Sequence, residues 1–193
     1  MGPDREVSPW NIANLLTMLR ILMVPVFMWM FLQEGTAMRV GATAVFVLAA
    51  LTDKLDGHLA RSRGLITNLG KILDPIADKA LVIAALLLLS VDGLVPWWVT
   101  IVIIVRELGI TVLRFFMIRR EVMAASRGGK LKATLQMVFI VGMLVPWHAL
   151  LPGMLATFLS VTATVLMYLA VAVTVWTGVQ YLLDAVRISR EHR

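Results

Sequence analysis

Six long apolar stretches alternate with short polar connections along the chain. Each stretch is close to the about 20 residues that an α-helix needs to cross a bilayer. None of the connections is long enough to form a further domain. The pattern therefore predicts an all-α integral membrane protein in which residues 1–193 form a single domain with six transmembrane helices. The expected spans are Leu15–Leu32, Val40–Ala60, Ile72–Val91, Val95–Ile118, Leu131–Leu150 and Met154–Leu183.

The composition supports the same class of protein. Hydrophobic residues make up 60% of the 193 residues, and the mean hydropathy is +0.86, whereas soluble domains contain about 45–50% apolar residues. The polar start, Met1–Trp10, lacks the basic region and cleavage site of a secretory signal. We therefore expect no processing there, and a short amphipathic segment before the first span. The absence of cysteine excludes disulfides and cysteine-linked lipids.

The distribution of positive charge predicts the orientation in the membrane. The net charge is +6, and the basic residues gather at both ends of the chain and in the second and fourth connections, with Arg39 as the exception. Since basic connections stay in the cytoplasm, both termini are expected there. Trp97, Trp98 and Trp147 then fall at the outer interface. Bases spread in this way beside apolar segments favour anionic lipid head groups, not nucleic acid, as the partner.

Four carboxylates interrupt this apolar pattern. Asp53 and Asp56 come near the end of the second stretch, and Asp74 and Asp78 near the start of the third. Each would cost about 2.5–3.5 kcal/mol near a bilayer centre without a partner. Because both pairs have helical spacing, they are expected to form one cup, open to the cytoplasm, between two helices. Hard oxygen ligands of this kind suit Mg²⁺ or Mn²⁺, and four acids leave room for two ions.

Small residues and an arginine accompany the four carboxylates. Gly57, Ala60 and Gly70 allow a ligand or a neighbouring backbone to approach closely, and Arg61 offers a planar fork for phosphate. The full pattern over residues 53–78 reads D-x2-D-G-x2-A-R-x8-G-x3-D-x3-D.

This pattern resembles the complete signature of the CDP-alcohol phosphotransferase family, which consists of integral membrane enzymes with six helices. Further segments resemble the members of that family whose acceptor is glycerol 3-phosphate, so the resemblance covers most of the chain up to about Gln136. One departure is Ala13, where the opening segment of those members usually carries proline, and it bears on the entry angle of the first helix. The similar segments are Asn11–Arg20, Asp74–Lys79, Val105–Leu108 and Gly129–Gln136.

The resemblance implies transfer of a phosphatidyl group from CDP-diacylglycerol to an alcohol, with release of CMP. It implies that Asp53, Asp56 and Asp74 are metal ligands, and that Asp78 is both a ligand and the base that takes the acceptor's proton. It further implies a homodimer in the bacterial inner (cytoplasmic) membrane, with its active site facing the cytoplasm. The residues that would line the CDP site are Gly57, Ala60, Arg61 and Gly70.

The acceptor site has to be sought among other charges. Arg106, Glu107 and Arg114 lie within the fourth apolar stretch, and ionisable residues inside a membrane are functional candidates by default. Glycerol 3-phosphate is the expected acceptor because of the resemblance, and several cations suit a phosphorylated alcohol. The candidates for its phosphate are Arg106, Arg114, Lys130, Lys132 and Arg20, with a hydroxyl from Thr17.

Alternatives remain at each step. The aspartates would also fit a structural salt-bridge network with Arg61 and Lys79, Arg106 would fit an ordinary ion pair with Glu107, and Lys130 and Lys132 would fit simple topology markers. The acceptor alternatives are inositol phosphate, serine and phosphatidylglycerol. An ion carrier is a further alternative, but the chain has no internal repeat and its acids cluster towards one face of the membrane, whereas carriers usually bind near the midplane.

Overall fold

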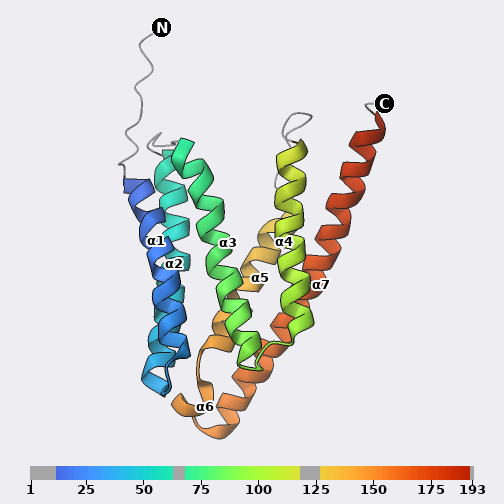
Figure 1. The fold of residues 1–193 in the computed structure, drawn as a ribbon. Helices are drawn as coiled ribbons and strands as arrows, with labels where there is room; N and C mark the ends of the chain where they lie inside the picture. Colours follow the sequence, from blue (N-terminus) through green and yellow to red (C-terminus); the bar gives the residue numbers. More distant parts are fainter. Residues whose placement is uncertain (1–11, 63–67, 118–126, 192–193) are drawn as a thin grey trace. The chain divides into compact units, whose positions relative to one another are not determined.

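The computed structural model describes residues 12–62, 68–117 and 127–191. Within these ranges the side chains at positions 13–14, 53–62, 68–75, 78, 113–117, 127–130, 182 and 184–191 are not described. All regular structure in the described ranges is helical (Figure 1), which confirms the all-α prediction. The helices are α1 (Ile12–Leu32), α2 (Thr36–Ser62), α3 (Asn68–Val91), α4 (Trp97–Met117), α5 (Arg127–Leu144), α6 (Trp147–Leu150) and α7 (Gly153–Glu191).

Two stretches in the described ranges are long and apolar enough to cross a membrane. They are Leu15–Leu32 in α1 and Gly153–Tyr181 in α7. Thr36–Thr52, Lys79–Val91 and Leu131–Leu144 are apolar but shorter. The predicted number of six crossing helices therefore stays a prediction. The predicted amphipathic segment at the N-terminus precedes the described residues.

The fifth apolar stretch differs from its predicted form because it contains a break. It was expected to be one helix over Leu131–Leu150, but α5 ends at Leu144 and α6 begins only at Trp147. Pro146 lies between the two helices; proline has no N–H to donate, and it disfavours a helical conformation in the residue before it. The indole Nε1 of Trp147 donates a hydrogen bond of 2.7 Å to the carbonyl of Gly142, which satisfies one of the last carbonyls of α5.

The chain forms two compact units, Met1–Leu88 and Leu89–Arg193. In the first unit α1 packs along α2, and Figure 1 shows the two helices running side by side. Phe27 and Phe46 are fully buried between these helices, with ring centroids 5.6 Å apart in a tilted arrangement. This aromatic contact fixes α2, the helix that carries Asp53 and Asp56.

Arg39, the exception in the charge distribution, lies near the start of α2 and stacks on an aromatic ring. Its Cζ is 3.8 Å from the centroid of the Phe31 ring. Such a cation–π contact is worth about 0.5–2 kcal/mol, depending on how far the charge is desolvated. Arg39 therefore has a local packing role. This role explains a basic residue beside a connection that was expected to hold few of them.

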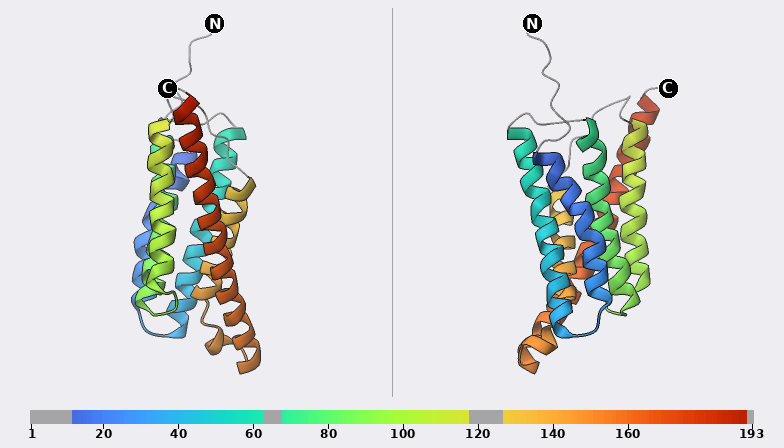
Figure 2. Two further views of the ribbon diagram at one scale, coloured as in Figure 1. Left: turned by 90° about the vertical axis from the view of Figure 1, so that its right-hand side faces the viewer. Right: turned by 60° about the vertical axis from the view of Figure 1, so that its left-hand side comes forward.

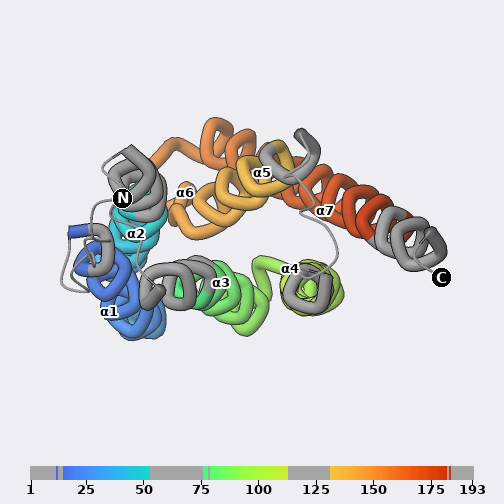
Figure 3. The backbone as a smooth tube through the Cα atoms, turned by 90° about the horizontal axis from the view of Figure 1, so that it is seen from above, coloured from blue at the N-terminus to red at the C-terminus, as the bar shows by residue number. Residues whose placement is uncertain are grey.

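In the second unit α4, α5 and α6 all pack against α7. Figures 2 and 3 show α5 and α4 running beside this long helix. The helices α5 and α7 approach each other closely at Gly142, where an added Cβ would stand 2.8 Å from the Cβ of Ala163. Two small residues thus let the helices approach closely, as is common in helix pairs within membranes.

We predict that Gly142→Ala lowers the melting temperature of the purified protein. The added methyl group overpacks the contact with Ala163, which typically costs about 1–3 kcal/mol. Gly109→Ala is the matched control, because Gly109 also lies within a helix and an added Cβ there meets nothing within 4 Å. The control is expected to melt at the same temperature or slightly higher, since alanine favours helix. Equal melting temperatures for the two variants would contradict the close packing of α5 on α7.

Candidate functional site

The four aspartates lie on α2 and α3, near the ends that face the connection between these helices. Asp56 comes six positions before the last residue of α2, and Asp74 comes six positions after the first residue of α3. The second member of each pair, Asp53 or Asp78, lies about one helical turn away along the same helix. The helical assignment of both segments thus agrees with the spacing on which the prediction rests.

The side chains of these aspartates lie outside the described part of the structure, so their predicted roles as ligands and base stay predictions. The same holds for the predicted CDP-site residues, which lie on the same two helices. Elsewhere, among the side chains that the structure does describe, no three His, Cys, Asp or Glu residues stand together as a metal site. The predicted CDP-site residues are Gly57, Ala60, Arg61 and Gly70.

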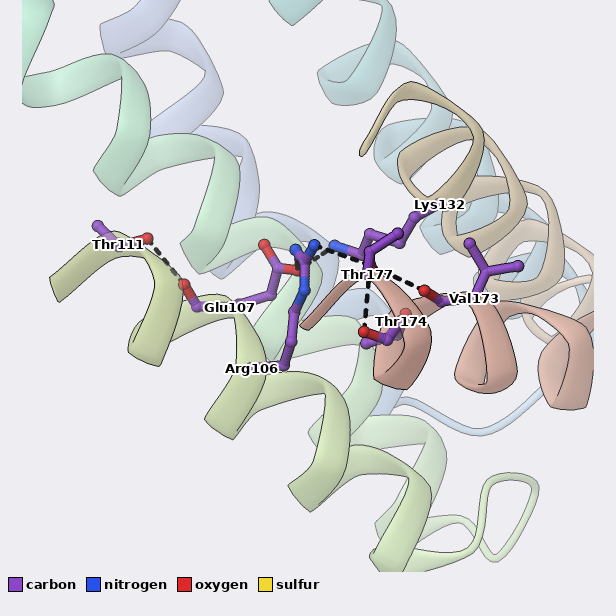
Figure 4. Close-up of polar contacts among 7 residues, drawn as sticks. All are labelled: Arg106, Glu107, Thr111, Lys132, Val173, Thr174 and Thr177. Carbon is purple, nitrogen blue, oxygen red and sulfur yellow. Dashed lines mark hydrogen bonds and ion pairs between the residues drawn. The ribbon is translucent and has the colours of Figure 1, made fainter. Parts of the chain in front are cut away.

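A charged cluster joins three helices of the second unit. We call it the Glu107 cluster; it consists of Arg106 and Glu107 on α4, Lys132 on α5 and Thr177 on α7 (Figure 4). Arg106 Nη1 donates a hydrogen bond of 3.0 Å to Glu107 Oε1, and Lys132 Nζ donates to the same oxygen. One carboxylate oxygen therefore binds two cations from different helices.

Thr177 binds the second terminal nitrogen of the Arg106 guanidinium. Arg106 Nη2 donates to the hydroxyl of Thr177 at 3.1 Å, and that hydroxyl donates in turn to the carbonyl of Val173, one turn back, at 2.8 Å. Because the hydroxyl proton is directed at the backbone, its lone pairs face the guanidinium. Arg106 is thus held from two sides, by Glu107 and by Thr177.

The cluster is mostly buried and carries a positive charge. The side chains of Lys132, Arg106 and Glu107 are 6%, 14% and 18% exposed. The two cations and the one carboxylate sum to a formal charge of +1, and buried charges of this kind need partners. A residue that only marks topology is not expected to be buried and paired, so the position of Lys132 favours a role in the interior.

Further polar atoms lie along the same helices without a hydrogen-bond partner. Within the described part of the chain these buried atoms include Arg106 Nε, Gln136 Oε1 and Thr174 Oγ1. Gln136 comes one turn after Lys132 on α5, and Thr174 comes three residues before Thr177 on α7. Buried polar groups usually find partners. These atoms therefore give the interior beside the Glu107 cluster unused hydrogen-bonding capacity.

The predicted acceptor residues are only partly brought together. Arg106 and Lys132 share Glu107 in the second unit. Thr17 and Arg20 belong to the first unit, where they lie one turn apart on α1 and are 1% and 0% exposed. The remaining two, Arg114 and Lys130, belong to α4 and α5, but their side chains fall outside the described part of the structure.

The sequence pattern indicates Glu107 as a functional candidate inside the membrane or as a partner of Arg106, but it does not identify Thr177 or Thr174. The spacing of Arg106, Glu107 and Lys132 gives no sign that one carboxylate serves both cations, because that contact joins different helices. Thr177 resembles several other threonines in the last apolar stretch, whose hydroxyls bond to the carbonyl four residues earlier. Only the arginine opposite it distinguishes Thr177.

We predict that Thr177→Val destabilises the protein by about 1–3 kcal/mol, because it leaves a buried donor of Arg106 without a partner. Thr162→Val is the matched control on the same helix, since the hydroxyl of Thr162 bonds to the carbonyl of Phe158 in an exposed position. Thermal unfolding in detergent gives the melting temperature of both variants, and only that of Thr177→Val should be lowered. If both variants melt at the wild-type temperature, the contact between Arg106 and Thr177 contributes nothing to stability.

The chain belongs to the CDP-alcohol phosphatidyltransferase family, whose model matches residues 10–176. This family consists of membrane enzymes that use a divalent metal. The match includes the whole aspartate pattern and three residues of the Glu107 cluster, Arg106, Glu107 and Lys132, and it ends one residue before Thr177. The family resemblance seen in the sequence is thus confirmed.

Individual relatives are similar in sequence to this chain over almost its whole length. A protein of Mycobacterium tuberculosis named probable phosphatidylglycerophosphate synthase is 48% identical over 180 residues, which cover 92% of this chain and 82% of the relative. Proteins named CDP-diacylglycerol–glycerol-3-phosphate 3-phosphatidyltransferase are similar as well. That of Bacillus subtilis is 37% identical over 185 residues, 89% of this chain and 93% of its own. That of Escherichia coli is 36% identical over 179 residues, which cover 90% of this chain and 93% of the relative.

Proposed function

We propose that this protein transfers the phosphatidyl group of CDP-diacylglycerol to sn-glycerol 3-phosphate and releases CMP. The product is phosphatidylglycerol phosphate, a step of phospholipid biosynthesis. The observation that carries the proposal is the similarity, over about 90% of the chain, to relatives named for this reaction. The membership of the chain in the family supports the transfer chemistry independently of the acceptor.

The proposal places the enzyme in the inner (cytoplasmic) membrane of a bacterium as a single domain with six crossing helices. Both termini and the active site face the cytoplasm, and two chains form a homodimer. The distribution of basic residues supports the orientation. The two long apolar stretches Leu15–Leu32 and Gly153–Tyr181 support the location in a membrane.

The carboxylates of α2 and α3 are proposed to bind two divalent ions, Mg²⁺ or Mn²⁺. Asp53, Asp56, Asp74 and Asp78 supply the hard oxygen donors that these ions prefer. Bound there, such ions neutralise the pyrophosphate and stabilise the charge that develops as the phosphoanhydride breaks. Asp78 also takes the proton of the acceptor hydroxyl, which typically accelerates a reaction by about 10²–10⁴-fold.

The CDP moiety is proposed to lie beside these carboxylates. A diacyl chain must stay in lipid while the nucleotide stays in water, so the pyrophosphate belongs near the cytoplasmic ends of α2 and α3. Gly57, Ala60 and Gly70 leave space for it, and the guanidinium of Arg61 pairs with phosphate oxygens.

The phosphate of glycerol 3-phosphate is proposed to bind the cations of the Glu107 cluster. Arg106 and Lys132 are already gathered on one carboxylate, and the cluster carries a net positive charge. A neutral acceptor such as serine has less need of this charge. The further cations assigned to this pocket are Arg114, Lys130 and Arg20, with the hydroxyl of Thr17.

The proposal is tested by measuring CMP release from CDP-diacylglycerol by the purified protein in detergent. Glycerol 3-phosphate, inositol phosphate, serine and phosphatidylglycerol are offered separately, with Mg²⁺, with Mn²⁺ or with a chelator. Release is expected only with a metal and glycerol 3-phosphate together. Release with another acceptor would keep the transfer chemistry and overturn the acceptor. No release with any of them, from folded protein, would favour the ion-carrier alternative.

We predict that Asp78→Asn abolishes turnover while the protein stays folded, because the amide neither binds the metal as a carboxylate does nor accepts the proton. The measurement is the same CMP-release assay, with melting temperature as a check of folding. Asp92→Asn is the matched control: Asp92 is an exposed carboxylate on the α3–α4 connection, and its variant should keep wild-type turnover. Near-normal turnover of Asp78→Asn would remove Asp78 from the reaction.

A further inference from the structure

The carboxylate of Glu107 stands where an anionic ligand of this pocket would bind. Its Oε1 accepts hydrogen bonds from Arg106 Nη1 and from Lys132 Nζ. These are the donors that the proposed acceptor site offers to a phosphate group. A phosphate therefore has to compete with Glu107 for them.

We propose that Glu107 is a resident anion that holds the place of the acceptor phosphate. In the empty enzyme it binds both cations, and an incoming phosphate replaces its carboxylate on Lys132 and on Arg106 Nη1. Glu107 is thus a positioning residue that acts through two phosphate-binding side chains. This inference rests on the proposed acceptor pocket.

Burial explains why the empty pocket needs an anion of its own. Lys132 and Arg106 are 6% and 14% exposed in their side chains, and two unpaired cations at such depth would destabilise the fold. Glu107 supplies a negative charge that both cations contact. Its side chain is 18% exposed, so its carboxylate is not fully enclosed.

Thr177 makes the exchange compatible with an ordered arginine. Arg106 Nη2 bonds to the hydroxyl of Thr177, and this contact does not involve Glu107. When the carboxylate leaves Nη1, the guanidinium therefore remains attached to α7. Figure 4 shows the arginine between Glu107 on one side and Thr177 on the other.

Buried polar atoms without partners on the same three helices suit a phosphate. Arg106 Nε and the hydroxyl of Thr174 are donors without a partner in the described structure. Gln136 adds an amide whose oxygen has no partner, and a half-turn of that amide presents its NH₂ group instead. A phosphate has several lone pairs that can accept hydrogen bonds from such groups. Glu107 makes no hydrogen bond to any of these three atoms. The pocket therefore has more donors than its resident carboxylate uses.

The test compares the binding of inorganic phosphate to three full-length proteins in detergent: wild type, Glu107→Gln and Glu34→Gln. Glu34 is the matched control, because it is an exposed carboxylate on the α1–α2 connection and its variant has the same change in net charge. Titration calorimetry at constant ionic strength gives each dissociation constant. Glu107→Gln is expected to bind phosphate about tenfold more tightly than wild type, which corresponds to about 1.4 kcal/mol; Glu34→Gln should bind like wild type.

Thermal unfolding distinguishes this role from a purely structural one. Glu107→Gln should melt at a lower temperature than wild type without phosphate, and added phosphate should raise its melting temperature more than that of wild type. Sodium chloride at matched ionic strength should not produce this larger rise in the melting temperature of Glu107→Gln. Phosphate binding by Glu107→Gln that is equal to or weaker than that of wild type would overturn the proposal, as would equal stabilisation by the two salts.

Two further variants keep the result interpretable. If Glu107→Gln does not fold, Glu107→Asp serves instead, since its shorter carboxylate reaches the cations less well; it should bind phosphate more tightly than wild type, and unchanged or weaker binding would overturn the proposal. Lys132→Gln tests the pocket itself. If wild type and Lys132→Gln bind phosphate equally, or if neither binds it, the proposed acceptor site is wrong. Binding that depends on Lys132 but is not tightened in Glu107→Gln overturns only the role of Glu107.

Discussion

Charges inside apolar helices need partners close by, and the second unit of this protein is organised by that constraint. In the second unit, α4, α5 and α7 each contribute a polar group to one cluster around Glu107. Small residues such as Gly142 and Ala163 bring α5 close to α7, and this packing allows Lys132 to reach a carboxylate on α4.

The two sites proposed for the reactants carry formal charges of opposite sign. The second unit has two cations on one carboxylate and carries further donors without partners. The α2–α3 segment of the first unit has four aspartates at helical spacing. The proposed reaction uses both kinds of charge: carboxylates for the ions that bind a pyrophosphate, and cations for a phosphorylated acceptor. In the proposed function, the metal ions and the acceptor phosphate bring charges of the opposite sign to these two sites.

Much of this organisation is readable from the sequence because it depends on local spacing. The helices follow from the apolar stretches, and the aspartate pattern follows from offsets of three and four residues within one helix. What the sequence does not reveal depends on contacts between helices. The shared carboxylate joins α4 to α5, and Thr177 differs from neighbouring threonines only through Arg106. The break before α6 was a missed local signal, since Pro146 alone predicts it.

The most direct test of the central claim, that the four aspartates exist to hold divalent ions, is a count of Mn²⁺ ions bound per chain by electron paramagnetic resonance. Purified full-length wild type is expected to bind two ions, and Asp53→Asn and Asp74→Asn are expected to bind fewer. Asp92→Asn, which changes an exposed carboxylate, should still bind two. Wild-type protein that binds no Mn²⁺, or variants at positions 53 and 74 that bind as many ions as wild type, would contradict the account.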